Sequence, residues 1–100
     1  MNDYIIFMHD DAPENSAHIN PAAWQAYFSM LKERGRFAGG SAIGPGVCVT
    51  NTGDARPITS HLSGYIRVLA DSIDDARTLL EGNPVLAAGG TVEIRLLARD

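Results

Sequence analysis

The segment "SGYIRVLADSIDDARTLLEGNPVLAAGGTVEIRLL", residues 63–97, decides the fold because it contains a complete strand–helix–strand unit. Residues 61–70 are rich in apolar and β-branched side chains, which predicts a strand. Ser72 follows as the cap of a helix, and Gly82 ends that helix. Residues 91–97 alternate between apolar and polar side chains, as a strand with one buried face does.

The N-terminal half of the chain has the same order of elements. Residues 4–9, "YIIFMH", form a continuous apolar run and predict a buried strand. Asn20 and Pro21 predict a helix start, because Asn caps well and Pro fits the first helical position. Two short strands are expected at 36–43 and 46–51, joined by a glycine–proline turn. The apolar side chains that recur on one face of the helix are Trp24, Tyr27, Phe28 and Leu31.

This order of elements predicts an α+β fold, a ferredoxin-like βαββαβ sandwich with an antiparallel sheet and an added hairpin strand at 46–51. Both helices lie on one face of such a sheet, so the other face stays open. The run at 4–8 nevertheless has apolar side chains on both faces. We therefore expect a homodimer formed through the open sheet face.

Length and composition predict one globular domain, residues 1–100, because 45% of the residues are apolar and only 20% are charged. A formal net charge of -4 argues against a nucleic-acid partner. No apolar run approaches the roughly 18 residues of a membrane span, and the N-terminal residues do not resemble a signal peptide. Cys48 is the only cysteine, which favours the cytoplasm, and we expect it to be buried in its strand.

Two glycine-rich segments, 39–46 and 87–90, match no nucleotide-binding pattern, so we expect turns there and no cofactor. The "HDD" tripeptide at 9–11, with His18, fits no metal-ligand spacing, so no metal site is predicted. Solvated loop residues explain that tripeptide. His9 differs from its neighbours, however, because it is the last residue of a central strand. Side chains at the ends of such strands often face a cleft.

Four charged or titratable strand residues are the candidate functional groups. His61 opens the strand next to that of His9, and such a histidine pair can transfer protons near neutral pH. Ordinary histidines at strand ends are the competing interpretation. Arg67 and Arg95 lie in the middle of apolar strands, where a charge needs a partner or a cavity. They either line a pocket for an anionic or carbonyl-bearing molecule, or form a cross-strand pair with Glu93 and bind nothing.

The segment at 63–97 resembles the C-terminal half of the YCII-related (DGPF) domain family. The resemblance rests on the strand that opens with Gly-Tyr, the helix beginning Asp-Ser-x-x-x-Ala, the proline turn, the small-residue loop and the strand reading Val-Glu-Ile-Arg. "YIIFMHDD" and "LKERGRFAGGSAIGPG" match the N-terminal half more loosely. The resemblance implies a ferredoxin-like fold of the dimeric α/β-barrel type, in a family whose members mostly have no assigned activity.

The chain departs from the family at two functional positions. "SHLSGY" stands where the Asp-Gly-Pro-Phe motif is expected. Members of the YCII type have a histidine early in the first helix and an aspartate before the turn proline, an implied acid–base pair. Here Ala23 and Trp24 occupy the first region and Asn83 the second, and an amide cannot exchange protons as a carboxylate does.

Three functions remain open from the sequence. The first is a cofactor-independent acid–base enzyme of the lyase or isomerase type with a pocket between the first helix and the sheet. In it His9 or His61 would transfer the proton, and Arg67 or Arg95 would bind an anionic substrate. Trp24 and Asn83 would line the pocket in that function. The second is a non-catalytic small-molecule-binding or regulatory domain, and the third is a module that only dimerises.

Overall fold

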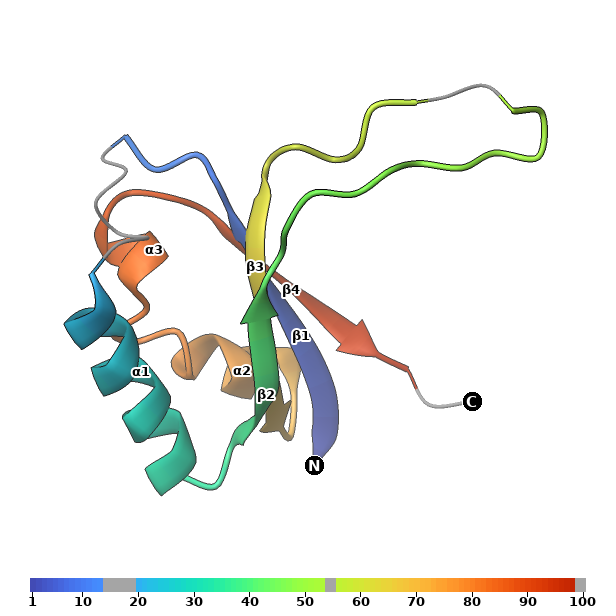
Figure 1. Ribbon diagram of the computed structural model, residues 1–100. Coiled ribbons are helices and arrows are strands. Elements are labelled where there is room, and N and C mark those ends of the chain that lie inside the picture. Colours follow the sequence, from blue (N-terminus) through green and yellow to red (C-terminus); the bar gives the residue numbers. More distant parts are fainter. Residues whose placement is uncertain (14–19, 54–55, 99–100) are drawn as a thin grey trace.

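The computed structural model describes residues 1–13, 20–53 and 56–98. Its helices and strands, in chain order, are β1 (Asn2–His9), α1 (Pro21–Glu33), β2 (Phe37–Ala42), β3 (Leu62–Ala70), α2 (Ile73–Thr78), α3 (Pro84–Ala87) and β4 (Val92–Leu97). The four strands form one antiparallel sheet in the order β2-β3-β1-β4, and the helices cover one of its faces (Figure 1). This is the predicted ferredoxin-like order, with the first and third strands of the chain at the centre.

The register of the central strands separates a buried face from an open one. Ile6 of β1 pairs with Ile66 of β3 on one side and with Ile94 of β4 on the other, and all three side chains face the helices. Tyr4 and Met8 share that face and are buried, whereas the alternate residues of β1 are partly exposed. The strand at 4–9, expected to be a buried strand, is therefore fully covered on one face only within this chain.

Helix α1 begins as the Asn-Pro pair predicts. The Asn20 side chain accepts a hydrogen bond from the backbone N–H of Ala23 at 3.2 Å, which caps the first turn. Tyr27 and Leu31 are buried under the helix, and the Tyr27 hydroxyl donates to the carbonyl of Leu79 at 2.8 Å. Burial raises the pKa of Tyr27, so this hydroxyl stays protonated and remains a donor.

Helix α2 begins at the predicted cap, where Ser72 accepts from the N–H of Asp75 at 3.0 Å. The Asp75 carboxylate accepts a hydrogen bond from Arg36 at 2.8 Å and one from the N–H of Asp71 at 2.9 Å. The bond to Arg36 lowers the pKa of Asp75 most. A single ionised carboxylate therefore connects the start of this helix to the chain just before β2.

The expected hairpin strand at 46–51 is wrong. Residues 43–53 and 56–61 extend away from the sheet as a long arm (Figure 1), and none of these described residues is in a strand. Val47 and Val49 are 83% and 86% exposed, so they pack on no sheet face, and Pro45 has no N–H to offer a ladder. Cys48, expected to be buried, is exposed as well. The arm helps to explain a radius of gyration of 14.8 Å, against about 13 Å for a compact chain of this length.

Candidate functional site

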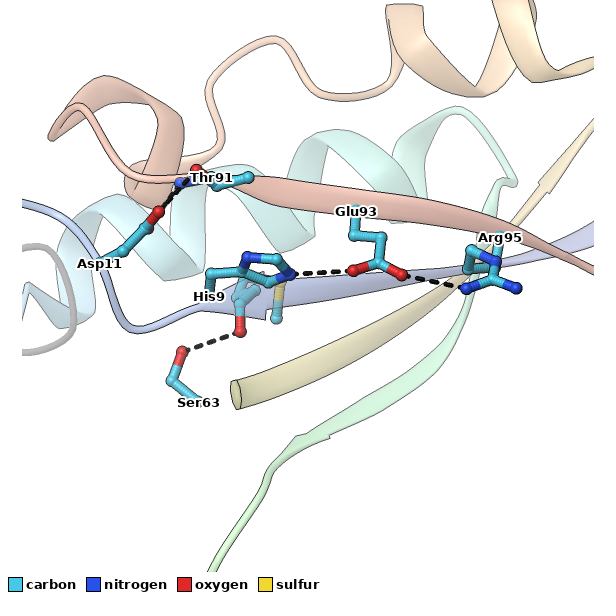
Figure 2. Close-up of polar contacts among 7 residues, drawn as sticks. His9, Asp11, Ser63, Thr91, Glu93 and Arg95 are labelled. Atoms are coloured by element: carbon cyan, nitrogen blue, oxygen red, sulfur yellow. Dashed lines mark hydrogen bonds and ion pairs between the residues drawn. The ribbon is translucent and has the colours of Figure 1, made fainter. Parts of the chain in front are cut away.

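Two histidine rings meet where β1 ends and β3 begins. The ring centroids of His9 and His61 lie 4.8 Å apart, edge to face, so the structure brings together the two residues that the sequence singled out. The Nε2 atom of His9 lies 3.0 Å from Oε1 of Glu93 on the neighbouring strand β4 (Figure 2). The result is an imidazole with a carboxylate on one side and a second imidazole beside it.

Glu93 is held from two directions. Its second oxygen, Oε2, accepts from Nη1 of Arg95 at 3.2 Å, so each carboxylate oxygen has its own partner (Figure 2). The hydrogen bond to His9 is the largest cause that lowers the pKa of Glu93, followed by the bond to Arg95. A carboxyl group with a lowered pKa is ionised at neutral pH, and it therefore acts there only as an acceptor.

The loop after β1 is fastened beside this cluster. Asp11 accepts from the backbone N–H of Thr91 at 2.8 Å and from its hydroxyl at 2.6 Å. These bonds, and to a smaller degree the nearby His9, lower the pKa of Asp11. The N–H of Asp10 donates to the carbonyl of His61, and the N–H of His9 donates to the carbonyl of Thr91 at 2.9 Å. The backbone at His9 and Asp10 is thus bonded to the residues that immediately precede β4 and β3.

Arg67 and Arg95 both lie on the open face of the sheet, because each pairs with Ile5 on opposite sides of β1. Arg67 lies 3.7 Å from the carboxylate of Asp3, and its buried Nε makes no hydrogen bond within the described residues. Arg95 bonds Glu93 of its own strand, two residues away, and not across strands as the competing interpretation expected. The open face therefore has two guanidinium groups, one on each side of β1.

A cavity of about 550 Å³ lies on the other face of the sheet, between α1 and the strands β2 and β3. Trp24 and Phe28 of the helix and Phe37 of β2 form an aromatic wall, with ring centroids 5.6 Å and 5.5 Å apart along the series. Trp24 thus lies at the predicted pocket between helix and sheet. Among the described residues, Asp10 is the one charged residue that lines this cavity, and neither His9 nor His61 does.

Asn83, predicted to line the pocket, is not among the residues that do so. It is 1% exposed and caps α3, accepting from the N–H groups of Val85 at 2.9 Å and Leu86 at 3.3 Å. The segment that was expected to be a turn is therefore a short helix with a buried cap. The Asn83 side chain therefore has a structural role as the cap of α3, which the family resemblance does not indicate.

Sequence reasoning missed the partner of His9 and part of the pocket. Glu93 was considered only together with Arg95, although its parity places it on the same face as His9. Asp10 was treated as a solvated residue, yet it lines the cavity. Among the described residues, no group of three or more His, Cys, Asp or Glu could hold a metal ion, and no helix is long and apolar enough to cross a membrane.

No protein-family model matches the chain, and no curated protein sequence matches it. A solved structure that does match is 5-chloro-2-hydroxyhydroquinone dehydrochlorinase from Burkholderia phenoliruptrix AC1100, in complex with 2,5-dihydroxybenzoquinone. The match has a TM-score of 0.59 and covers 98% of this chain and 95% of that one, at 15% sequence identity. At this identity the likeness shows the fold, which is the ferredoxin-like α+β arrangement described above.

Proposed function

We propose that the chain is a cofactor-independent acid–base enzyme, of the lyase or isomerase type, that acts on a small polar or anionic molecule. The observation that carries this proposal is the 3.0 Å contact between His9 and Glu93, with His61 against the same ring. An imidazole oriented by a carboxylate can accept a proton from a substrate and return it near neutral pH. Arg67 and Arg95, on the same open face, supply the positive charge that an anionic substrate needs.

The dehydrochlorinase supports this reaction class by analogy of fold. Its name describes the removal of hydrogen chloride, a reaction in which a base takes up a proton while chloride leaves. Its bound molecule, 2,5-dihydroxybenzoquinone, is a small ring rich in oxygen. A compound of this kind suits a site that combines an imidazole with guanidinium groups. We propose that residues 1–100 form a single domain that contains this site.

We further propose that the open sheet face is covered by a second copy of the chain. Partly exposed apolar side chains, among them Ile5, Phe7 and Tyr65, lie on this face around the charged cluster. A second sheet placed against it would remove them from water and enclose the histidines and arginines. Sedimentation velocity at a protein concentration of about 20 μM is expected to give the mass of a dimer, because an interface of standard size would keep two chains associated at that concentration. A monomer at that concentration would contradict the enclosure.

The reaction class is tested by turnover of the wild-type chain. Purified protein is incubated in D₂O buffer with 5-chloro-2-hydroxyhydroquinone and, separately, with 2,5-dihydroxybenzoquinone. Chloride release and the exchange of ring C–H for deuterium are measured against a protein-free control. We expect at least one of the two reactions to be accelerated, and the acceleration to persist with EDTA present. Rates equal to the protein-free control for both compounds would count against the proposal.

A non-catalytic binding domain is the second candidate, and the cavity beside α1 favours it. The cavity is mainly apolar and aromatic, and neither His9 nor His61 lines it, so it can hold a ligand without transforming it. Trp24 is the only tryptophan of the chain and lies in this wall, so its fluorescence reports occupancy directly. Saturable quenching of Trp24 without turnover would favour binding alone, whereas turnover that requires His9 would favour the enzyme.

A further inference from the structure

We propose that Glu93 is a positioning residue that fixes His9 with its neutral-form proton on Nε2, which makes Nδ1 the nitrogen that exchanges protons with substrate. This inference deepens the proposed function and rests on it. It gives Glu93 a role beyond the pairing with Arg95 that the sequence suggests. It also specifies which nitrogen atom of His9 exchanges protons with the substrate.

The assignment of the proton follows from the carboxylate. Glu93 is ionised at neutral pH because His9 and Arg95 both lower its pKa, and an ionised carboxylate can only accept hydrogen bonds. The contact of 3.0 Å between Nε2 and Oε1 is therefore a hydrogen bond only if Nε2 carries the proton. Neutral imidazole has one N–H, so Nδ1 then has a free lone pair.

The position of Nδ1 agrees with this assignment. Figure 2 shows Glu93 on one side of the ring and the other ring nitrogen turned away from it. No hydrogen bond to Nδ1 from the described part of the chain competes for the lone pair. The His9 side chain is 19% exposed, so most of the ring is covered but it is not fully enclosed.

Sheet geometry holds the pair in register. Phe7 lies directly opposite Glu93 in the pairing of β1 with β4, and the pairing of β1 with β3 shifts between Met8 and His9. The N–H of His9 is bonded to the carbonyl of Thr91, which immediately precedes β4 and lies two residues before Glu93. The histidine backbone and its carboxylate partner are thus held by the same short segment of chain. A fixed backbone limits the rotamers through which the ring could leave Glu93.

In the reaction, Nδ1 of neutral His9 takes a proton from a C–H or O–H bond of the substrate, and the electron pair of that bond stays on the substrate. The imidazolium so formed has protons on both nitrogens, and its charge is balanced by Glu93 at Nε2. Arg95 keeps the carboxylate ionised and aligned through its other oxygen. Return of the proton from Nδ1 to the product or to water restores the starting state.

The test is ¹⁵N NMR of protein labelled at its histidines, under conditions in which His9 is neutral, with the His9 signals assigned by their loss in His9→Gln. We expect the proton on Nε2 and a slowly exchanging Nε2–H signal. Glu93→Ala should abolish the slow exchange and lower kcat for chloride release about tenfold, with KM little changed. Glu81→Ala, at an exposed glutamate after α2, is the matched control and should change neither quantity.

Glu93→Gln keeps the side-chain volume and an oxygen acceptor, so it guards against a folding defect in the alanine variant. It should retain the Nε2–H signal but lower kcat, because a neutral amide cannot balance an imidazolium. A proton found on Nδ1 in the wild type, or an unchanged Nε2–H signal in Glu93→Ala, would overturn the role of Glu93. If instead the NMR result is as expected and the wild type has no turnover, the positioning geometry stands and only the proposed enzymatic function has failed.

Discussion

His9→Gln is expected to lower kcat for chloride release about a hundredfold, the lower end of what a positioned acid–base group contributes. Glutamine approximates the size of imidazole and can still donate to Glu93, but it cannot take up or release a proton near neutral pH. The loss should appear in kcat more than in KM, because the proton moves only in the transition state. Initial rates over a range of substrate concentrations measure both constants.

Two further variants make the result specific. His61→Gln should have a smaller effect, because the contact of that ring in the described structure is with His9 and not with a carboxylate. Gln25→Ala, on the exposed face of α1, should leave both constants unchanged. A His9→Gln enzyme with wild-type kcat and an unchanged melting temperature would remove His9 from the mechanism.

Gly40→Ala is expected to destabilise the fold by about 3 kcal/mol, because it forces two strands apart. A Cβ atom at residue 40 would lie 2.6 Å from the carbonyl oxygen of Tyr65 and 3.1 Å from Cα of Ile66. Both atoms belong to the backbone of β3, so no side-chain rotation can relieve the contact. The same residue lines the cavity beside α1, and the variant should therefore also change the fluorescence of Trp24.

Gly44→Ala is the matched control, since a Cβ atom there would meet no atom within 4 Å and the backbone is not in the left-handed region. We expect its free energy of unfolding in urea to stay within about 0.5 kcal/mol of the wild type. If Gly40→Ala were as stable as Gly44→Ala, the close pairing of β2 with β3 at this position would be wrong.

The order of elements could be predicted from the sequence because each boundary has a local physical signal. The Asn-Pro pair at 20–21 predicted a helix start, and the structure places α1 there. The same pair at 83–84 begins α3, whereas the sequence predicts a turn there because Gly82 ends the preceding helix and Pro84 prevents its continuation. A capping signal states where a helix begins and says little about how long it is.

The site was harder to predict because it depends on contacts between distant strands. The pairing of His9 with His61 followed from the expected strand order. The bond from His9 to Glu93 joins residues 84 positions apart, and it forms only because β1 and β4, the first and last strands of the chain, lie side by side. The arm was predicted to contain a hairpin strand for a different reason. Its alternating valines, Val47 and Val49, match a strand pattern, but such a pattern does not show whether a neighbouring strand is available for pairing.

The cap at the start of α3 bears on how proteins of this fold diverge. Asparagine and aspartate cap helices about equally well, so an exchange between them at residue 83 preserves the bonds to Val85 and Leu86 while it adds or removes a negative charge. Asn83 is 1% exposed, however, so aspartate at this position would bury its charge at a desolvation cost, and an exchange between the two residues changes stability together with the chemistry of the position.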